Sequence, residues 1–299
     1  MINSFLQYLQ YEKNYSSYTV LSYRDDIKAF GEFLQQNAPQ TDIAQADTDQ
    51  IRQWLMQQRE QKKSATTVNR RLAALRAFYR FLLQRGIITR NPTSKIAAAK
   101  TPKKVPTFFR EKDMEQLLDI SQKNTTFEAC RDEAILETFY QTGIRLSELL
   151  NIKDIDIDFD RQTLRVFGKR KKERVIPFGN GLAQILQQYM AVRNAEIKNN
   201  TPYLYILRSG KQMYAAAVYR IVHRIMTNIS TQQKCSPHVL RHTFATDMLN
   251  NGADINAVKE LLGHANLAAT QIYTHTTFEQ IHNIYMQAHP RADKTDKHT

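Results

Sequence analysis

The sequence contains little cysteine and no long apolar run. Its two cysteines, Cys130 and Cys235, stand far apart, which argues against a disulfide framework and against the close ligand spacing of a zinc site. The N-terminus, MINSFLQYLQYEKNYSS, lacks the apolar core of a signal peptide, and no stretch reaches the roughly 18 apolar residues of a membrane span. We therefore expect a reduced, cytoplasmic protein without a membrane segment.

Acidic residues are scarce relative to basic ones. The 299 residues include 42 Lys and Arg against 29 Asp and Glu, a net charge of +13. This excess indicates a polyanionic partner, with nucleic acid as the first expectation. A soluble protein that is merely basic stays an alternative until the charge is localised. With 42% hydrophobic and 24% charged residues, the chain is typical of a globular protein of two domains.

Residues 1–96 have the apolar spacing of a helical domain. Helices are predicted around Phe5 to Leu9, along Val20 to Leu34, after Asp47, and between Ser64 and Gly86. Between the apolar positions of the last helix stand four arginines. Either a solvated helix face or a surface that faces phosphate would explain them. They are Arg70, Arg71, Arg76 and Arg80.

Residues 97–107, AAAKTPKKVPT, lose this periodicity and combine prolines with lysines. They predict a basic linker between a helical domain at 1–96 and a second domain at 108–299. Two domains joined in this way could close round a duplex, although a solvated linker without any ligand has the same composition.

The second domain opens with predicted helices over Glu111 to Ser121 and Phe127 to Gln141. Gly143 ends the second of these, and Arg145 follows in the sequence TGIRLSE. An arginine in such a break can point inward from a turn, where a buried guanidinium group requires an anion. That anion is either a ligand or an internal carboxylate such as Glu148.

Three alternating segments then predict a small β-sheet, at Asp154 to Phe159, Thr163 to Phe167 and Arg174 to Phe178. The last two flank a strongly basic turn that begins with Gly168 and Lys169. Such a tip is either solvated or able to deliver Lys169 to a phosphate. Helices at about 180–198 and 215–230 follow. The predicted fold class is mainly α with a small β-sheet.

The stretch from Ser236 to His275 carries most of the chemistry. Ser236 and Pro237 begin a predicted helix that Gly252 ends, Asp254 caps a second helix that ends at Gly263, and Asn266 caps a third. On this stretch lie four side chains able to bind phosphate or to move a proton. A helical His and Arg three residues apart share a face but are often structural, and a tyrosine at helical spacing is often a core residue. The four are His238, Arg241, His264 and Tyr273.

A last amphipathic helix is predicted from Phe278 to Ala288, and the polar tail HPRADKTDKHT after it is predicted to be disordered. The apolar face of this helix packs either in its own domain or on a neighbouring subunit. It comprises Phe278, Ile281, Ile284, Tyr285 and Met286.

Taken in order, TGIRLSE, the basic hairpin, HVLRH, LLGH and the tyrosine after it resemble the tyrosine site-specific recombinase (phage-integrase) family, and its Xer branch in particular. The resemblance spans nearly the whole chain. It implies a helical core DNA-binding domain at 1–96, a linker at 97–107, and an α+β catalytic domain at 108–299 with a C-terminal exchange helix.

The resemblance also implies a mechanism without metal or cofactor. Tyr273 attacks the scissile phosphate and forms a 3′-phosphotyrosyl link, Lys169 protonates the leaving 5′-oxygen, and His238 relays the proton of the tyrosine. The remaining residues, Arg145, Arg241 and His264, hold the phosphate oxygens.

The expected function is site-specific DNA recombination that resolves chromosome or plasmid dimers at cell division. The expected partners are double-stranded DNA, three further recombinase protomers, identical or of a second kind, and a cell-division DNA translocase. Integration or excision of a mobile element is one alternative. A catalytically silent, architectural DNA-binding protein is another.

Overall fold

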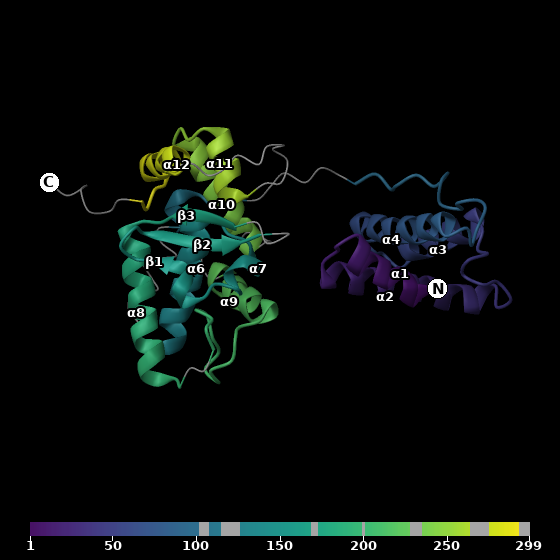
Figure 1. Ribbon diagram of the computed structural model, residues 1–299, viewed down its shortest axis with the longest axis horizontal. Helices are drawn as coiled ribbons and strands as arrows, with labels where there is room; N and C mark the ends of the chain where they lie inside the picture. The colour runs from purple at the N-terminus through teal and green to yellow at the C-terminus, as the bar shows by residue number, and fades with distance from the viewer. Residues whose placement is uncertain are drawn as a thin grey trace. The chain divides into compact units, whose positions relative to one another are not determined.

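The computed structural model describes residues 1–101, 108–114, 126–168, 173–198, 201–227, 235–263 and 275–292. They belong to two compact units, Met1–Lys104 and Val105–Thr299, each with its own hydrophobic core (Figure 1). The division falls within the segment 97–107, of which residues 102–107 lie outside the described part. The domain limits and the linker stay predictions. Within the described ranges, no helix is long and apolar enough to cross a bilayer.

The N-terminal unit is helical, as its apolar spacing predicts. It contains α1 (Ile2–Gln7), the π-helical turn η1 (Tyr8–Glu12), α2 (Ser17–Asn37), α3 (Thr48–Glu60) and α4 (Ala65–Gln84). The predicted caps are confirmed. Asp47 accepts hydrogen bonds from the first turn of α3 in a capping box with Gln50, and Ser64 accepts one from the N–H of Thr67. Phe30, Trp54 and Phe78 are fully buried between the helices.

Three of the four arginines of α4 bind groups within this unit. Arg70 donates to the buried carboxylate of Asp26, Arg71 lies 3.6 Å from the same carboxylate, and Nη2 of Arg76 donates to the carbonyl oxygen of Ile96. Arg80 is exposed. The sequence offered a solvated face or a phosphate-facing surface for all four, and for these three the internal contacts are the better explanation.

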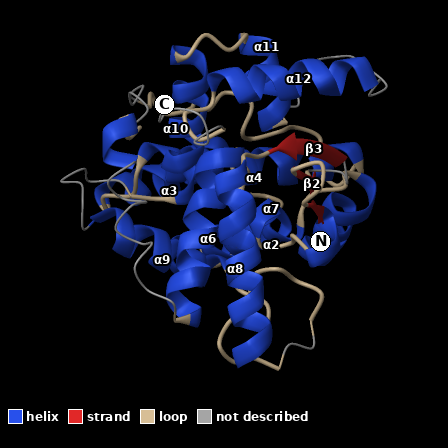
Figure 2. Ribbon diagram, turned by 90° about the vertical axis from the view of Figure 1, so that its left-hand side faces the viewer, coloured by secondary structure: helices blue, strands red, loops and turns tan. Residues whose placement is uncertain are grey.

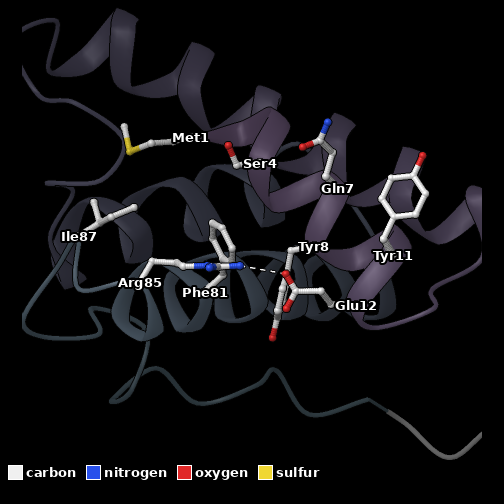
Figure 3. Close-up of a pocket in the computed structure, with 9 residues that line it drawn as sticks. All are labelled: Met1, Ser4, Gln7, Tyr8, Tyr11, Glu12, Phe81, Arg85 and Ile87. Atoms are coloured by element: carbon white, nitrogen blue, oxygen red, sulfur yellow. Dashed lines mark hydrogen bonds and ion pairs between the residues drawn. The ribbon is translucent and has the colours of Figure 1, made fainter.

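The chain beyond residue 96 is still held by the N-terminal unit. The side chain of Asn69 exchanges two hydrogen bonds with the backbone of Ala99, at 2.8 and 2.9 Å. The same unit has a surface cavity of about 520 Å³. Figure 3 shows the residues that line it, which come from α1, η1 and the chain at and just after the end of α4. Arg85 donates to Glu12 beside it at 2.9 Å. None of the predicted catalytic residues lines this cavity.

The second unit places helices around a small antiparallel sheet (Figures 1 and 2). Its described helices are α6 (Phe127–Thr142), α7 (Leu146–Leu149), α8 (Asn180–Glu196), α9 (Ala215–Thr227), α10 (Pro237–Asn250), α11 (Ile255–Leu262) and α12 (His275–Ala288). The helix predicted from residue 111 is described only over 111–114. The third helix predicted after Asn266 lies outside the described residues.

The sheet has the order β1 (Ile157–Asp158), β2 (Thr163–Phe167), β3 (Glu173–Pro177). β2 and β3 pair antiparallel, with Phe167 opposite Glu173, as the predicted hairpin requires. The basic residues 169–172 between them lie outside the described residues. The first predicted strand is wrong in part, because Asp154–Asp156 form a 3₁₀ turn. Asp156 there accepts from the N–H of Lys153, and such local capping competes with strand pairing.

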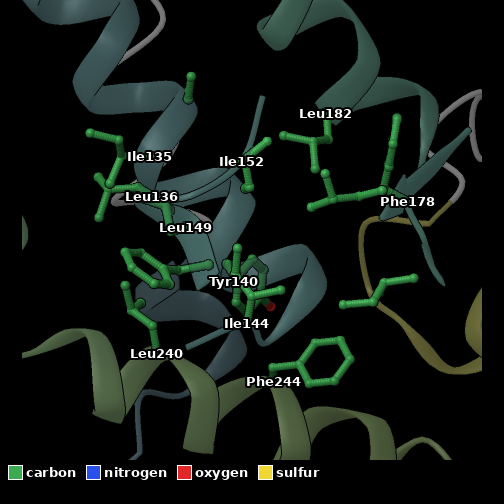
Figure 4. Packing of buried hydrophobic residues seen from close by; sticks show 14 of the residues in the cluster. Ile135, Leu136, Tyr140, Ile144, Leu149, Ile152, Phe178, Leu182, Leu240 and Phe244 are labelled. Atoms are coloured by element: carbon green, nitrogen blue, oxygen red, sulfur yellow. The ribbon is translucent and has the colours of Figure 1, made fainter. Parts of the chain in front are cut away.

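Helix α6 forms the centre of this unit and is buried along almost its whole length. Figure 4 shows Tyr140 and Ile144, at the end of α6 and just beyond it, packed against Leu240 and Phe244 of α10. This packing fixes the turn after α6 relative to α10, and both segments carry predicted site residues.

The C-terminal region is buried further than its composition predicts. Within this chain α12 packs on α10, α11 and β3, with Tyr285 fully buried and Ile281 almost so. The tail predicted to be disordered is ordered over 289–292: His289 is buried, and Arg291 forms an ion pair with the buried Glu137 of α6. The prediction was wrong for these residues because a long-range partner compensates the buried charge.

Candidate active site

A left-handed turn places Arg145. Gly143 ends α6 with φ 58° and donates its N–H to the carbonyl oxygen of Phe139, as the predicted glycine stop requires. Arg145 then becomes the N-cap of α7. Its Nη1 donates to Oε1 of Glu148 at 2.9 Å, and its Nη2 donates to the carbonyl oxygen of Gly263 at 3.0 Å. The sequence left open whether the anion beside Arg145 is a ligand or an internal carboxylate. The internal carboxylate, Glu148, is present, and 40% of the Arg145 side chain remains exposed, so a ligand can also reach it.

Glu148 is the carboxylate at the centre of the cluster. It is almost fully buried and accepts two parallel hydrogen bonds from Arg174 of β3, at 2.8 and 2.9 Å. Burial pushes its pKa up, but hydrogen bonds and charge from Arg174 and Arg145 outweigh burial and hold the pKa below its ordinary value. Glu148 is therefore ionised at neutral pH.

Arg241 enters the same cluster from α10. Its Nη1 donates to the carbonyl oxygen of Gly143 and its Nη2 to that of Leu262, each at 2.6 Å. Burial, together with the positive charge of Arg145, lowers the pKa of Arg241 to about 10. The guanidinium group is still charged at neutral pH, but an anion beside it would relieve an unfavourable environment.

The C-terminal end of α11 is thus surrounded by guanidinium groups. Three successive carbonyl oxygens there each accept from a different arginine: that of Leu261 from Arg174, that of Leu262 from Arg241, and that of Gly263 from Arg145. Carbonyl groups at a helix end carry partial negative charge, which favours cations. Arg145 and Arg241, far apart in sequence, therefore lie at the same helix end.

His238 lies on α10 one turn before Arg241 and is exposed. Its ring makes a T-shaped contact with His242, with the centroids 4.6 Å apart. Burial and the charges of His238 and Arg241 lower the pKa of His242. His242 is hence a neutral neighbour of His238 at neutral pH.

The described structure brings together Arg145 and Arg241 and places His238 on the helix of Arg241. Lys169, His264 and Tyr273 lie outside the described residues, although Gly263 immediately before His264 is part of the cluster. Sequence reasoning missed Arg174. Arg174 was predicted to begin the strand after the basic turn, and its burial at the start of β3 is the feature that the sequence did not signal.

Comparison with known proteins identifies the family. A model described as "Phage integrase family" matches residues 107–280, and one described as "Phage integrase, N-terminal SAM-like domain" matches residues 2–86. The chain belongs to the phage integrase family. It is a site-specific tyrosine recombinase, as the motifs predict.

Two relatives within the family illustrate how far the similarity extends. The tyrosine recombinase XerC of Anoxybacillus flavithermus is 37% identical over 295 residues, covering 97% of this chain and 98% of the relative. That of Listeria innocua is 39% identical over 291 residues, covering 96% and 97%.

Solved structures agree on the fold. The crystal structure of XerA recombinase is 26% identical with a TM-score of 0.50, covering 97% of this chain and 98% of that one. The post-cleavage complex of XerH recombinase with its difH substrate reaches a TM-score of 0.71 at 18% identity, covering 97% and 82%. The mainly α fold with a small sheet, predicted from the sequence, is confirmed.

Proposed function

We propose that this recombinase cuts and rejoins double-stranded DNA through a covalent link to Tyr273, and that it resolves chromosome or plasmid dimers at cell division. The observation that carries the proposal is the convergence of Arg145 and Arg241 on the end of α11. Three guanidinium groups and one carboxylate meet there: Arg145 and Arg174 pair with Glu148, whereas Arg241 donates to carbonyl oxygens only. The cluster keeps a net positive charge suited to a phosphodiester.

The two arginines would bind the non-bridging oxygens of the scissile phosphate. Arg145 has the exposed side chain needed to reach a ligand, and Arg241 has a lowered pKa that an anion would restore. The extra negative charge of the pentacoordinate transition state would strengthen both contacts, which is the condition for catalysis rather than mere binding.

Tyr273 would be the nucleophile. A tyrosine of pKa about 10 lies about three units from neutral pH, so its ionisation costs roughly 4 kcal/mol. His238, exposed on the helix of Arg241, would accept or relay the tyrosine proton, and His264 would hydrogen-bond the same phosphate. Lys169 would protonate the departing 5′-oxygen. These roles rest on the match to the family motifs.

The covalent link retains the energy of the phosphodiester. A 5′-hydroxyl group from another strand can therefore reverse the step without ATP, metal or cofactor, and this makes exchange between two duplexes possible. Exchange requires four protomers, and passage of α12 to a neighbouring protomer is the predicted contact between them. Dependence on a second recombinase and control by a DNA translocase stay predictions.

The test uses a nicked DNA site that traps the covalent product. The parent protein should form an adduct that survives denaturing electrophoresis, and Tyr273→Phe should form none. Tyr285→Phe is the matched control, because this tyrosine is fully buried in the same C-terminal region and should be dispensable for cleavage. An adduct with Tyr273→Phe would refute the nucleophile. DNA binding by the parent without an adduct would favour an architectural protein.

A further inference from the structure

Arg174 is buried and directs its guanidinium group entirely at the active-site cluster. Only 7% of its side chain is exposed. Nε donates to the carbonyl oxygen of Leu261 at 2.8 Å, while Nη1 and Nη2 donate to the two oxygens of Glu148 at 2.8 and 2.9 Å. A single side chain from β3 therefore joins the strand, α7 and the last turn of α11.

Glu148 is shared between Arg174 and Arg145. Its Oε1 accepts from both guanidinium groups, and its Oε2 accepts from the backbone N–H of Arg145 at 2.8 Å as well as from Arg174. Arg174 makes the bidentate contact and Arg145 the single one. Arg174 hence balances most of the negative charge of Glu148, and Arg174 does not face the proposed phosphate.

We propose that Arg174 is a positioning residue for strand cleavage: it neutralises Glu148 and fixes the carboxylate, so that Arg145 keeps both its orientation and its positive charge for the scissile phosphate. This inference rests on the proposed function. Arg174 touches neither the phosphate nor the tyrosine in this account and acts only through Glu148 and the end of α11.

Removal of Arg174 should change the electrostatics at the phosphate. Without it, the buried carboxylate of Glu148 has Arg145 as its nearest remaining cation, and a buried charge takes the partner that is available. Arg145 would then be drawn into a full ion pair with Glu148. The phosphate would lose the charge and the free donors of Arg145 together.

The surrounding backbone is built around Arg174. Gly263 adopts φ 63°, and a Cβ atom at this position would lie 3.0 Å from Nη1 and 3.2 Å from Cδ of Arg174. The turn that leads to His264 thus fits closely over this arginine, which is consistent with a role in ordering the site.

Arg165 is the matched control. It lies on the adjacent strand β2, opposite Val175, and pairs with another buried carboxylate, that of Asp156, at 3.1 Å. It makes no described contact with Glu148 or with the end of α11. Arg165→Met therefore removes an arginine–carboxylate pair of the same sheet without touching the cluster.

The experiment measures single-turnover adduct formation at saturating DNA on two nicked substrates. One has a normal scissile phosphate, and the other has a methylphosphonate, which is uncharged in the ground state. Its transition state carries one negative charge fewer and so needs less charge neutralisation. On the phosphate, Arg174→Met should be slower than the parent by about 100-fold, the scale of losing one preorganised electrostatic contact. On the methylphosphonate, the loss should shrink to less than about tenfold. Arg174→Lys should fall between parent and Arg174→Met, and Arg165→Met should match the parent on both.

Two results would overturn the inference. Parental cleavage of the phosphate by Arg174→Met would show that Arg174 is dispensable, and equal losses on both substrates would show a general structural defect. Thermal unfolding of each variant shows whether it is folded. If Arg174→Met does not fold, the loss of rate on the phosphate is compared with the loss on the methylphosphonate for Arg174→Lys instead. If the parent itself forms no adduct on the phosphate, the proposed function fails instead.

Discussion

Gly143→Ala should destabilise the second unit far more than the same change at Gly252. Both glycines have positive φ, 58° and 87°, so alanine at either position incurs about 1–2 kcal/mol of backbone strain. They differ in their surroundings. A Cβ at Gly143 would lie 2.5 Å from Cδ1 of Phe244 and 2.9 Å from Cδ2 of Leu262, whereas a Cβ at Gly252 meets nothing within 4 Å.

The difference between the two variants isolates the cost of overpacking. Forcing a methyl group into a packed core costs about 1–3 kcal/mol, so Gly143→Ala should lose this amount beyond Gly252→Ala. For a unit of this size the extra loss lowers Tm by about 2–12 °C. Because the carbonyl oxygen of Gly143 accepts from Arg241, the same variant should also form the covalent adduct more slowly than Gly252→Ala.

Calorimetric unfolding of the full chain, with the nicked-substrate assay on the same preparations, measures both effects. Equal destabilisation by the two substitutions would show that Phe244 and Leu262 do not pack over the turn. An unchanged adduct rate in a destabilised Gly143→Ala protein would show that Arg241 does not depend on this turn.

Two buried titratable groups predict how stability depends on pH. Burial raises the pKa of Asp247 to about 6, although the hydrogen bond that it accepts from Tyr140 lowers the pKa. The folded protein therefore favours the protonated carboxyl group, whose contribution to the free energy of unfolding is present below the ordinary pKa and is lost as pH rises through 6. Asp247→Asn should therefore raise stability at pH 8 by about 2–3 kcal/mol, and the gain should vanish near pH 4 in denaturant titrations; a constant gain would contradict this. Burial lowers the pKa of His289 to about 4, so its contribution is present above the ordinary pKa near 6.5 and is lost as pH falls toward 4. Between pH 6.5 and 4, the free energy of unfolding should fall by about 3 kcal/mol less in His289→Gln than in the parent protein. An equal fall in both proteins would refute burial of this ring.

Local signals predicted the helices of both units well. Asp47, Ser64, Gly143 and Gly263 each end or begin a helix through a hydrogen bond to their own neighbourhood, so their residue type suffices. Arg145 could be singled out because it stands two residues after one of these stops, Gly143.

Long-range pairing could not be predicted in the same way. Arg174 meets Glu148 across 26 residues, and Arg291 meets Glu137 across 154 residues. In sequence, Arg174 begins a predicted strand directly after a basic turn, and Arg291 lies in a polar tail. Each is buried because one distant carboxylate offsets its charge, and only the fold brings the partners together.

The most direct test of the central claim identifies the residue that carries the DNA. The covalent complex with the nicked substrate is digested with nuclease and trypsin, and the nucleotide-bearing peptide is sequenced by tandem mass spectrometry. Cleavage after Lys259 and Arg291 gives a peptide that contains both Tyr273 and Tyr285. The predicted result is a nucleotide linked to Tyr273 through its 3′-phosphate. A nucleotide on Tyr285, or on any residue outside this peptide, would contradict the account.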